Sequence, residues 1–257
     1  MVSAEMAVIV GPAFAAGLMI ALTHAPLGIA VLKRGIIFID LAIAQIAGLG
    51  VVAANFMSPE PSWWLVQGTA LACAVLAALF FRFVERFLPD QQEAIIGCSF
   101  VLAASLAILL LADHPNGGEA IQHLLSGQLL FVTWEQAVRH MPVYAVILAL
   151  WFLRPQTREG IWFYMLFSVA ITSSVQLAGV FVVFASLIAP ALGAVRHAEY
   201  RPALRAAYAI ACAGLISGFS VTIFTDLPIG SVLVCSLMLS AMLISLWPLK
   251  RAAESCG

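Results

Sequence analysis

A succession of apolar runs dominates this chain, and each run is long enough to cross a lipid bilayer as a helix. The hydrocarbon core of a bilayer takes about 20 helical residues to span, and inside it every backbone polar group must be satisfied within the segment. The sequence therefore predicts an all-α fold, a polytopic transmembrane helical bundle of about eight or nine segments. The expected segments lie at about 6–32, 36–57, 63–81, 94–112, 136–153, 161–177, 179–195, 203–224 and 231–248.

These runs leave almost nothing for a soluble domain. Of the 257 residues, 63% are hydrophobic and only 10% are charged, whereas soluble domains carry roughly 25% charged residues. We therefore expect residues 1–257 to form a single transmembrane domain. No nucleotide-binding, hydrolase or zinc-protease motif occurs, so we do not expect this chain to be an enzyme. The net charge of −1 indicates no nucleic-acid partner.

The distribution of basic residues predicts how the segments are oriented across the membrane. Eleven of the twelve lysines and arginines fall in alternate connections, and only Arg139 falls on the other side. Because connections rich in lysine and arginine stay in the cytoplasm, we expect the N-terminus outside and the C-terminus inside.

The same rule bears on residues 161–195, which are long enough for one helix of about 50 Å. A single crossing would place Arg154 and Arg196 on opposite sides. We therefore expect a break around 176–179, after which the chain returns by a full crossing or a re-entrant element. Polar side chains lie at this break, and they either satisfy freed backbone groups or line a path. They are Ser173, Ser174 and Gln176.

An acid and an amide interrupt the second run, where Asp40 and Gln45 stand among apolar residues. An aspartate at the centre of a membrane helix costs about 2.5 to 3.5 kcal/mol, so such residues usually face a bundle interior and mark what is moved. Asp40 is therefore the residue that we expect to meet the cargo. His24, just before Ala25 and Pro26 in the first run, either reaches the same cavity as a ligand or is hydrogen-bonded to a neighbouring helix.

The longest connection, at 113–135, is expected to contain a short helix that lies in the membrane interface. Glu119 and His123 are four residues apart in it, so one helical face can carry both. They form either a binding site for a divalent ion or part of a solvated face.

Five stretches, in this order along the chain, resemble the membrane permease subunit of ABC-type zinc/manganese uptake transporters. They are APLGIAVLKRGIIFID at 25–40, EAIIG at 93–97, LLSGQLLFVTWE at 124–135, GVFVVFASLIAPALGA at 179–194 and TDLPIGSVLV at 225–234. Gln128 stands where this family usually has an aspartate, and it is a further candidate for lining the pathway. The resemblance covers nearly the whole chain.

The resemblance implies a permease of the bacterial cytoplasmic (inner) membrane that imports a divalent metal ion, zinc or manganese. The ion would come from an extracytoplasmic metal-binding protein, and a separate ATP-binding cassette ATPase would drive transport. A second copy of the permease is expected, so that two copies of Asp40 can assemble one site. The metal is cargo, and no permanently bound cofactor is implied.

The sequence departs from the family at the metal site. In the family, a histidine follows the acid of the second helix after four residues. Counting from the basic pair Lys33 and Arg34, this position is Ala44, whereas counting back from Gly50 it is Gln45. An amide oxygen is a harder ligand than imidazole and suits magnesium, calcium or manganese better than zinc.

A second departure concerns the connection at 154–160, which is much shorter than the family segment that carries a cytoplasmic coupling helix. We therefore expect an ATPase to contact the connections at 82–94 and 196–205, where Pro202 can start a helix. Their candidate coupling residues are Glu85, Arg86, Glu93, Arg196, Glu199 and Arg201. The alternative is a secondary metal transporter or channel that no longer couples to an ATPase.

Overall fold

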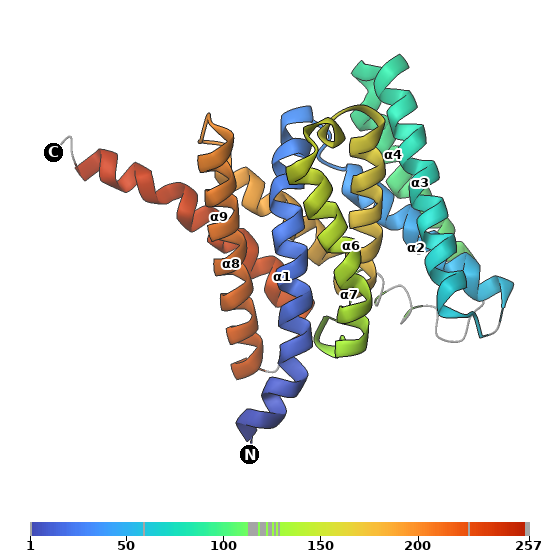
Figure 1. Cartoon of the computed structure of the whole chain (residues 1–257), viewed down its shortest axis with the longest axis horizontal. Helices are drawn as coiled ribbons and strands as arrows, with labels where there is room; N and C mark the ends of the chain where they lie inside the picture. The colour runs from blue at the N-terminus through green and yellow to red at the C-terminus, as the bar shows by residue number, and fades with distance from the viewer. Residues whose placement is uncertain are drawn as a thin grey trace. The chain divides into compact units, whose positions relative to one another are not determined.

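The computed structural model describes the backbone of residues 2–254, except 59, 113–117, 119–121, 123, 124, 126, 128 and 226. The described residues form helices and the connections between them and contain no strand (Figure 1). The α-helices are α1 (Val2–Arg34), α2 (Ile39–Met57), α3 (Trp63–Phe87), α4 (Gln92–Leu111), α6 (Trp134–Leu153), α7 (Gly160–Ala194), α8 (Tyr200–Thr225) and α9 (Ile229–Glu254). The 3₁₀ helices are η1 (Pro89–Gln91), η2 (Leu129–Phe131) and η3 (Pro155–Arg158).

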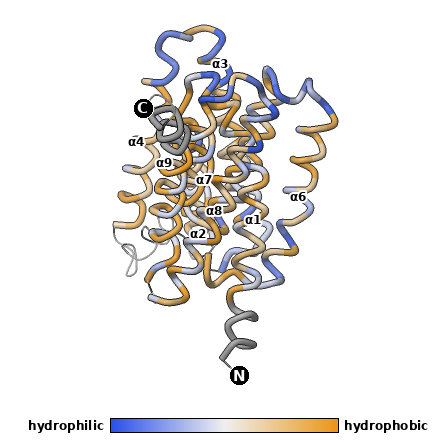
Figure 2. The backbone as a smooth tube through the Cα atoms, turned by 90° about the vertical axis from the view of Figure 1, so that its left-hand side faces the viewer, coloured by the Kyte–Doolittle hydropathy of each residue, from blue (hydrophilic) through white to orange (hydrophobic). Residues whose placement is uncertain are grey.

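The predicted all-α class is confirmed. Seven helices in the described part of the chain are long and apolar enough to cross a membrane, and Ile229–Ser245 adds a shorter apolar helix. In Figure 2, hydrophobic residues run along the helices while hydrophilic stretches gather mainly at their ends and connections. The predicted orientation of the termini stays a prediction.

The chain groups into two compact units. Unit 1 contains Met1–Arg34, Gln128–Arg139 and Phe184–Gly257, and unit 2 contains Gly35–Gly127 and His140–Val183. In unit 1, α8 packs against both α1 and α9. The α8–α9 approach is close, because a Cβ added at Gly214 would lie 2.9 Å from the Cα of Leu237. Small residues allow such approaches between apolar helices.

In unit 2, α2 is the central element and packs against α3 and α4. Gly50 allows the contact with α3, since a Cβ there would lie 2.8 Å from the carbonyl oxygen of Thr69. The chain reaches α2 from α1 through a turn at Gly35, whose φ is 71°. This turn places Asp40 in the first turn of α2 and not in its middle.

The predicted break near residues 176–179 is confirmed. Gly179 has φ 78° and ψ 165° inside α7, which divides the element into two helical pieces. This backbone region is open essentially to glycine alone. The two predicted segments at 161–177 and 179–195 are therefore the two pieces of α7, and the predicted return of the chain to its basic side stays a prediction.

Two predicted connections are shorter in the structure. Helix α3 continues past the expected end at 81 to Phe87, because the buried Phe81 and Val84 extend its apolar face at a helical spacing. Helix α8 already begins at Tyr200, so Pro202 lies in the first turn of this long helix, close to the helix start predicted for it. The interfacial helix expected at 119–134 falls largely outside the described residues.

Candidate functional site

Asp40 is buried at the N-terminus of α2. Its side chain is 1% exposed, and neither carboxylate oxygen accepts a hydrogen bond from a described residue. The backbone N–H groups of Asp40 and Leu41 are nevertheless close to it. Since the N-terminus of a helix carries a partial positive charge, this position offsets part, but not all, of the cost of burying a carboxylate there.

Glu93, in the first turn of α4, approaches the same end of α2. Its Oε1 accepts a hydrogen bond of 3.2 Å from the backbone N–H of Phe38, the residue before α2. Its Oε2 is buried and has no described partner, and its negative charge acts on Asp40. The structure thus brings together a carboxylate predicted to bind metal and one predicted to couple to the ATPase.

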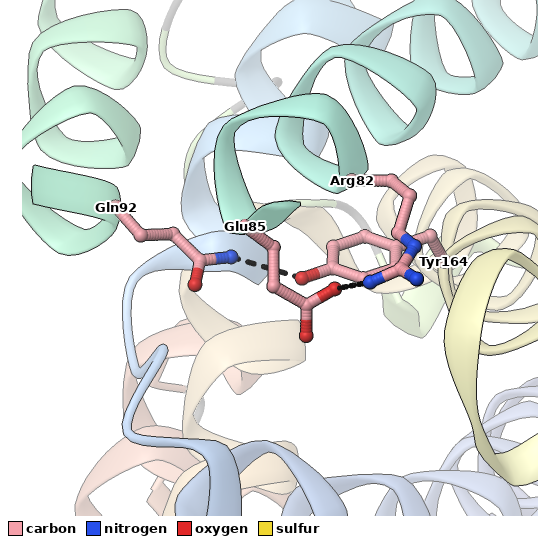
Figure 3. A network of polar contacts seen from close by, with 4 residues as sticks. All are labelled: Arg82, Glu85, Gln92 and Tyr164. Carbon is pink, nitrogen blue, oxygen red and sulfur yellow. Dashed lines mark hydrogen bonds and ion pairs between the residues drawn. The ribbon is translucent and has the colours of Figure 1, made fainter. Parts of the chain in front are cut away.

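The neighbouring Gln92 connects this end of α4 to α7. Its Nε2 donates a hydrogen bond of 2.9 Å to the hydroxyl of Tyr164. Figure 3 shows this contact beside the ion pair between Arg82 and Glu85 of α3. The connection predicted to meet an ATPase is therefore bonded to α7 as well as to the start of α2.

Asp40 and Gln45 do not share a face of α2. Both are buried, but on a regular α-helix two side chains that are five residues apart point in directions about 140° apart around the helix axis. Side chains four residues apart differ in direction by only about 40°, so Ala44 lies on the same face of α2 as Asp40. Helix α2 runs without interruption from Ile39 to Met57, and no bulge brings Gln45 into register.

His24 lies in unit 1, where a hydrogen bond of 2.7 Å joins its Nδ1 to the hydroxyl oxygen of Ser186 on α7. This contact corresponds to the second of the two interpretations of His24, a histidine bonded to a neighbouring helix. The adjacent proline is accommodated in a similar way. Pro26 leaves the carbonyl of Leu22 without its helical donor, and the hydroxyl of Tyr208 donates to that carbonyl at 3.1 Å.

Gln176 borders a cavity of about 360 Å³ in unit 2. Its Oε1 accepts a hydrogen bond from Nε2 of Gln67 on α3, while its own Nε2 is buried without a described partner. The polar Asn55 and Thr172 also line this cavity, and apolar side chains complete the wall. Of the predicted pathway residues that the structure describes, Gln176 is therefore the one that lines this cavity.

Ser173 and Ser174 are engaged with α6. His140 Nδ1 lies 2.7 Å from the Ser173 hydroxyl oxygen, and the hydroxyls of Tyr144 and Ser174 lie 2.9 Å apart. These contacts favour a structural role near the break in α7. Sequence reasoning missed His140 and Tyr144, although their spacing of four residues in an apolar run places both on one helical face.

The remaining candidates contribute less to a site. Glu119, His123 and Gln128 lie outside the described residues. Arg196 and Glu199 are exposed in the connection before α8, and Arg201 is exposed in its first turn. In the part of the chain that the structure describes, no three histidine, cysteine or acidic side chains are grouped to hold a metal ion.

Comparisons with known proteins agree with this fold. A family model, the ABC 3 transport family, matches residues 6–157 and 154–248. The structure of PsaBC from Streptococcus pneumoniae in complex with Fab is similar with a TM-score of 0.75 and 17% sequence identity, over 96% of this chain and 95% of that chain. An ABC transporter described as metal-chelate type, in an inward-facing conformation, has a TM-score of 0.69 and 15% identity, over 95% of this chain and 88% of that one.

No curated protein matches the sequence significantly. The two structures share the fold of this chain, and the family match extends over nearly its full length. The match confirms the predicted resemblance to ABC permeases, and with it the predicted role as a multi-pass transport subunit. The chain belongs to the ABC 3 transport family.

Proposed function

We propose that this permease imports a divalent metal ion, zinc or manganese. The observation that carries the proposal is the buried carboxylate of Asp40, which has no hydrogen-bond partner among the described residues. Buried polar groups are almost always satisfied, so an exception calls for a missing ion or donor. The similarity to an ABC transporter of the metal-chelate type supports a metal as that ion.

The expected partners are a separate ATP-binding cassette ATPase, an extracytoplasmic metal-binding protein and a second copy of the permease in a bacterial inner membrane. Two local contacts support ATPase coupling through the α3–α4 connection. Gln92 and Glu93, in the first turn of α4, bond to α7 and to the start of α2, while Arg86 at the end of α3 and Asp90 in η1 are exposed. A partner that moves this connection would therefore act on two helices of unit 2.

The short connection between α6 and α7 supports this choice of coupling segment. It contains only the four-residue η3, and the two parts of the family match meet there, at 154–157. An ATPase would therefore contact other connections. Co-purification tests this point, because a permease that does not retain an ATP-binding subunit in mild detergent would support the secondary-transporter alternative.

Uptake of radioactive manganese and zinc by cells tests the proposed cargo. Asp40→Asn keeps the shape of the side chain but removes its charge, and we expect it to reduce uptake by at least about tenfold, since a divalent ion loses a buried charge partner. Glu60→Gln is the matched control, because Glu60 is exposed between α2 and α3. Equal uptake by wild type and Asp40→Asn, at equal amounts of membrane protein, would contradict the proposal.

A further inference from the structure

Unsatisfied acceptors are concentrated at one place in unit 2. Among the described residues, five buried side-chain nitrogen or oxygen atoms have no hydrogen-bond partner, and three of them are carboxylate oxygens of Asp40 and Glu93. An ionised carboxylate only accepts hydrogen bonds. The missing partner is therefore a donor or a cation.

The two carboxylates come from different helices that pack together. Asp40 is in the first turn of α2 and Glu93 is in the first turn of α4, and these helices are in contact. The hydrogen bond from Phe38 fixes Glu93 Oε1 at the N-terminus of α2. Glu93 Oε2 and both oxygens of Asp40 remain available to a shared ligand.

Charge favours a cation over a neutral donor. With a ligand bound through their oxygens, the two carboxylates are ionised and carry two negative charges, whereas each helix N-terminus contributes roughly +0.5. About one negative charge therefore remains uncompensated in a buried place, where isolated charges are costly. Arg82 pairs with Glu85, and none of the three free oxygens has a hydrogen-bond partner among the described residues.

We propose that Asp40 and Glu93 together hold the transported ion through oxygen atoms alone. The inference rests on the proposed function and specifies its chemistry. Carboxylate ligands suit manganese, magnesium and calcium, whereas zinc is bound chiefly through nitrogen and sulfur. The site therefore takes a hard divalent cation of the manganese class. Glu93, which the sequence indicates only as a coupling residue, becomes an ion ligand placed directly after the α3–α4 connection.

Binding of Mn²⁺ alone to the purified full-length permease tests the inference by electron paramagnetic resonance. We expect Glu93→Gln and Asp40→Asn each to weaken Mn²⁺ binding by at least about tenfold, because each removes one of two charges that face the ion. Glu85→Gln is the matched control, since this carboxylate lies at the same end of unit 2 but pairs with Arg82. It should bind Mn²⁺ as the wild type does.

Two further readouts separate ligation from folding. Pulsed resonance of bound Mn²⁺ should show no nitrogen coupling from histidine, and Mn²⁺ should raise the melting temperature of the wild type but not of Glu93→Gln. The variants remove buried uncompensated charge, so they should fold without metal. Histidine nitrogen coupling, or wild-type Mn²⁺ affinity in Glu93→Gln, would overturn the inference.

Failure of the proposed function and failure of the two-carboxylate site give different results. If wild-type cells import neither manganese nor zinc, the cargo assignment is wrong, and the proposed ion site of Asp40 and Glu93 is wrong as well. If the wild type imports and binds manganese while Glu93→Gln does so equally well, divalent-metal import stands and only the two-carboxylate site is wrong.

Discussion

At the scale of single residues, a difference of one position along α2 decides which side chain can bind the same ion as Asp40. The turn from Asp40 to Ala44 is about 40°, whereas the turn to Gln45 is about 140°. The sequence left both positions as counterparts of the family histidine. A regular helix from Ile39 to Met57 favours Ala44, so we expect the family position to hold a methyl group and the proposed site to have no imidazole there.

Ala44→His should therefore shift the cargo preference towards zinc. The new imidazole lies one turn from Asp40 on the same face, and imidazole is a preferred zinc ligand. Ala44 is 1% exposed, so the larger side chain should also cost about 1 to 3 kcal/mol of stability. The ratio of zinc to manganese uptake measures the effect. Gln45→His is the control, and an equal shift in that variant would contradict the helical register.

The contact between His24 and Ser186 should matter for stability and not for metal. Replacing one partner removes a buried hydrogen bond, which contributes roughly 0.5 to 1.5 kcal/mol. We expect Ser186→Ala to lower the thermal unfolding temperature while Mn²⁺ binding stays at the wild-type value. A large loss of Mn²⁺ affinity in Ser186→Ala would instead support His24 as a ligand.

The candidate site was predictable in part. Asp40 is visible in the sequence because an acid stands out in an apolar run, and its cost in lipid points to function. The proximity of Glu93 is not visible, since it depends on the packing of α2 against α4 across more than 50 residues of chain. Spacing alone places side chains on a face but does not say which face meets which helix.

At the scale of elements, α7 shows how charge and backbone chemistry act together. The distribution of arginines required a break, and Gly179 provides the conformation for it. The end of α3 was missed because Arg82, Glu85 and Arg86 look like a polar connection. Burial of Val84 continues the helix there, and an apolar position within a charged segment is a weak signal.

Gly179→Ala should destabilise the protein by about 1 to 3 kcal/mol, because a side chain at φ 78° and ψ 165° is strained. Thermal unfolding in detergent measures the change. Gly97→Ala is the matched control, since a Cβ at Gly97 in α4 meets no atom within 4 Å and alanine favours a helix by about 1 kcal/mol. Equal destabilisation by both substitutions would show that the break does not depend on the glycine conformation.

At the scale of the whole molecule, hydropathy, charge and motif order are sufficient for fold class and family. Long apolar runs leave few alternatives to a helical bundle, and the five ordered motifs point to an ABC permease from the amino-acid sequence alone. The grouping into two units was not expected. The grouping depends on which helices pack together, and α6 and α7 are each divided between the units. The residue pattern along one helix does not show which other helices it packs against.

Coupling to an ATPase is the property of the whole molecule that most needs a test. Arg86 is exposed at the end of α3, on the connection bonded to α2 and α7. Arg86→Glu should weaken co-purification of the ATPase and lower metal-dependent ATP hydrolysis several-fold, because a reversed charge at a rim position repels a complementary partner. Mn²⁺ binding should persist, since Arg86 donates no hydrogen bond to either oxygen of Asp40 or to Oε2 of Glu93. Arg201→Glu, at the start of α8, tests the second predicted contact in the same assay. Full ATPase coupling in both variants would exclude these two connections as the docking surface.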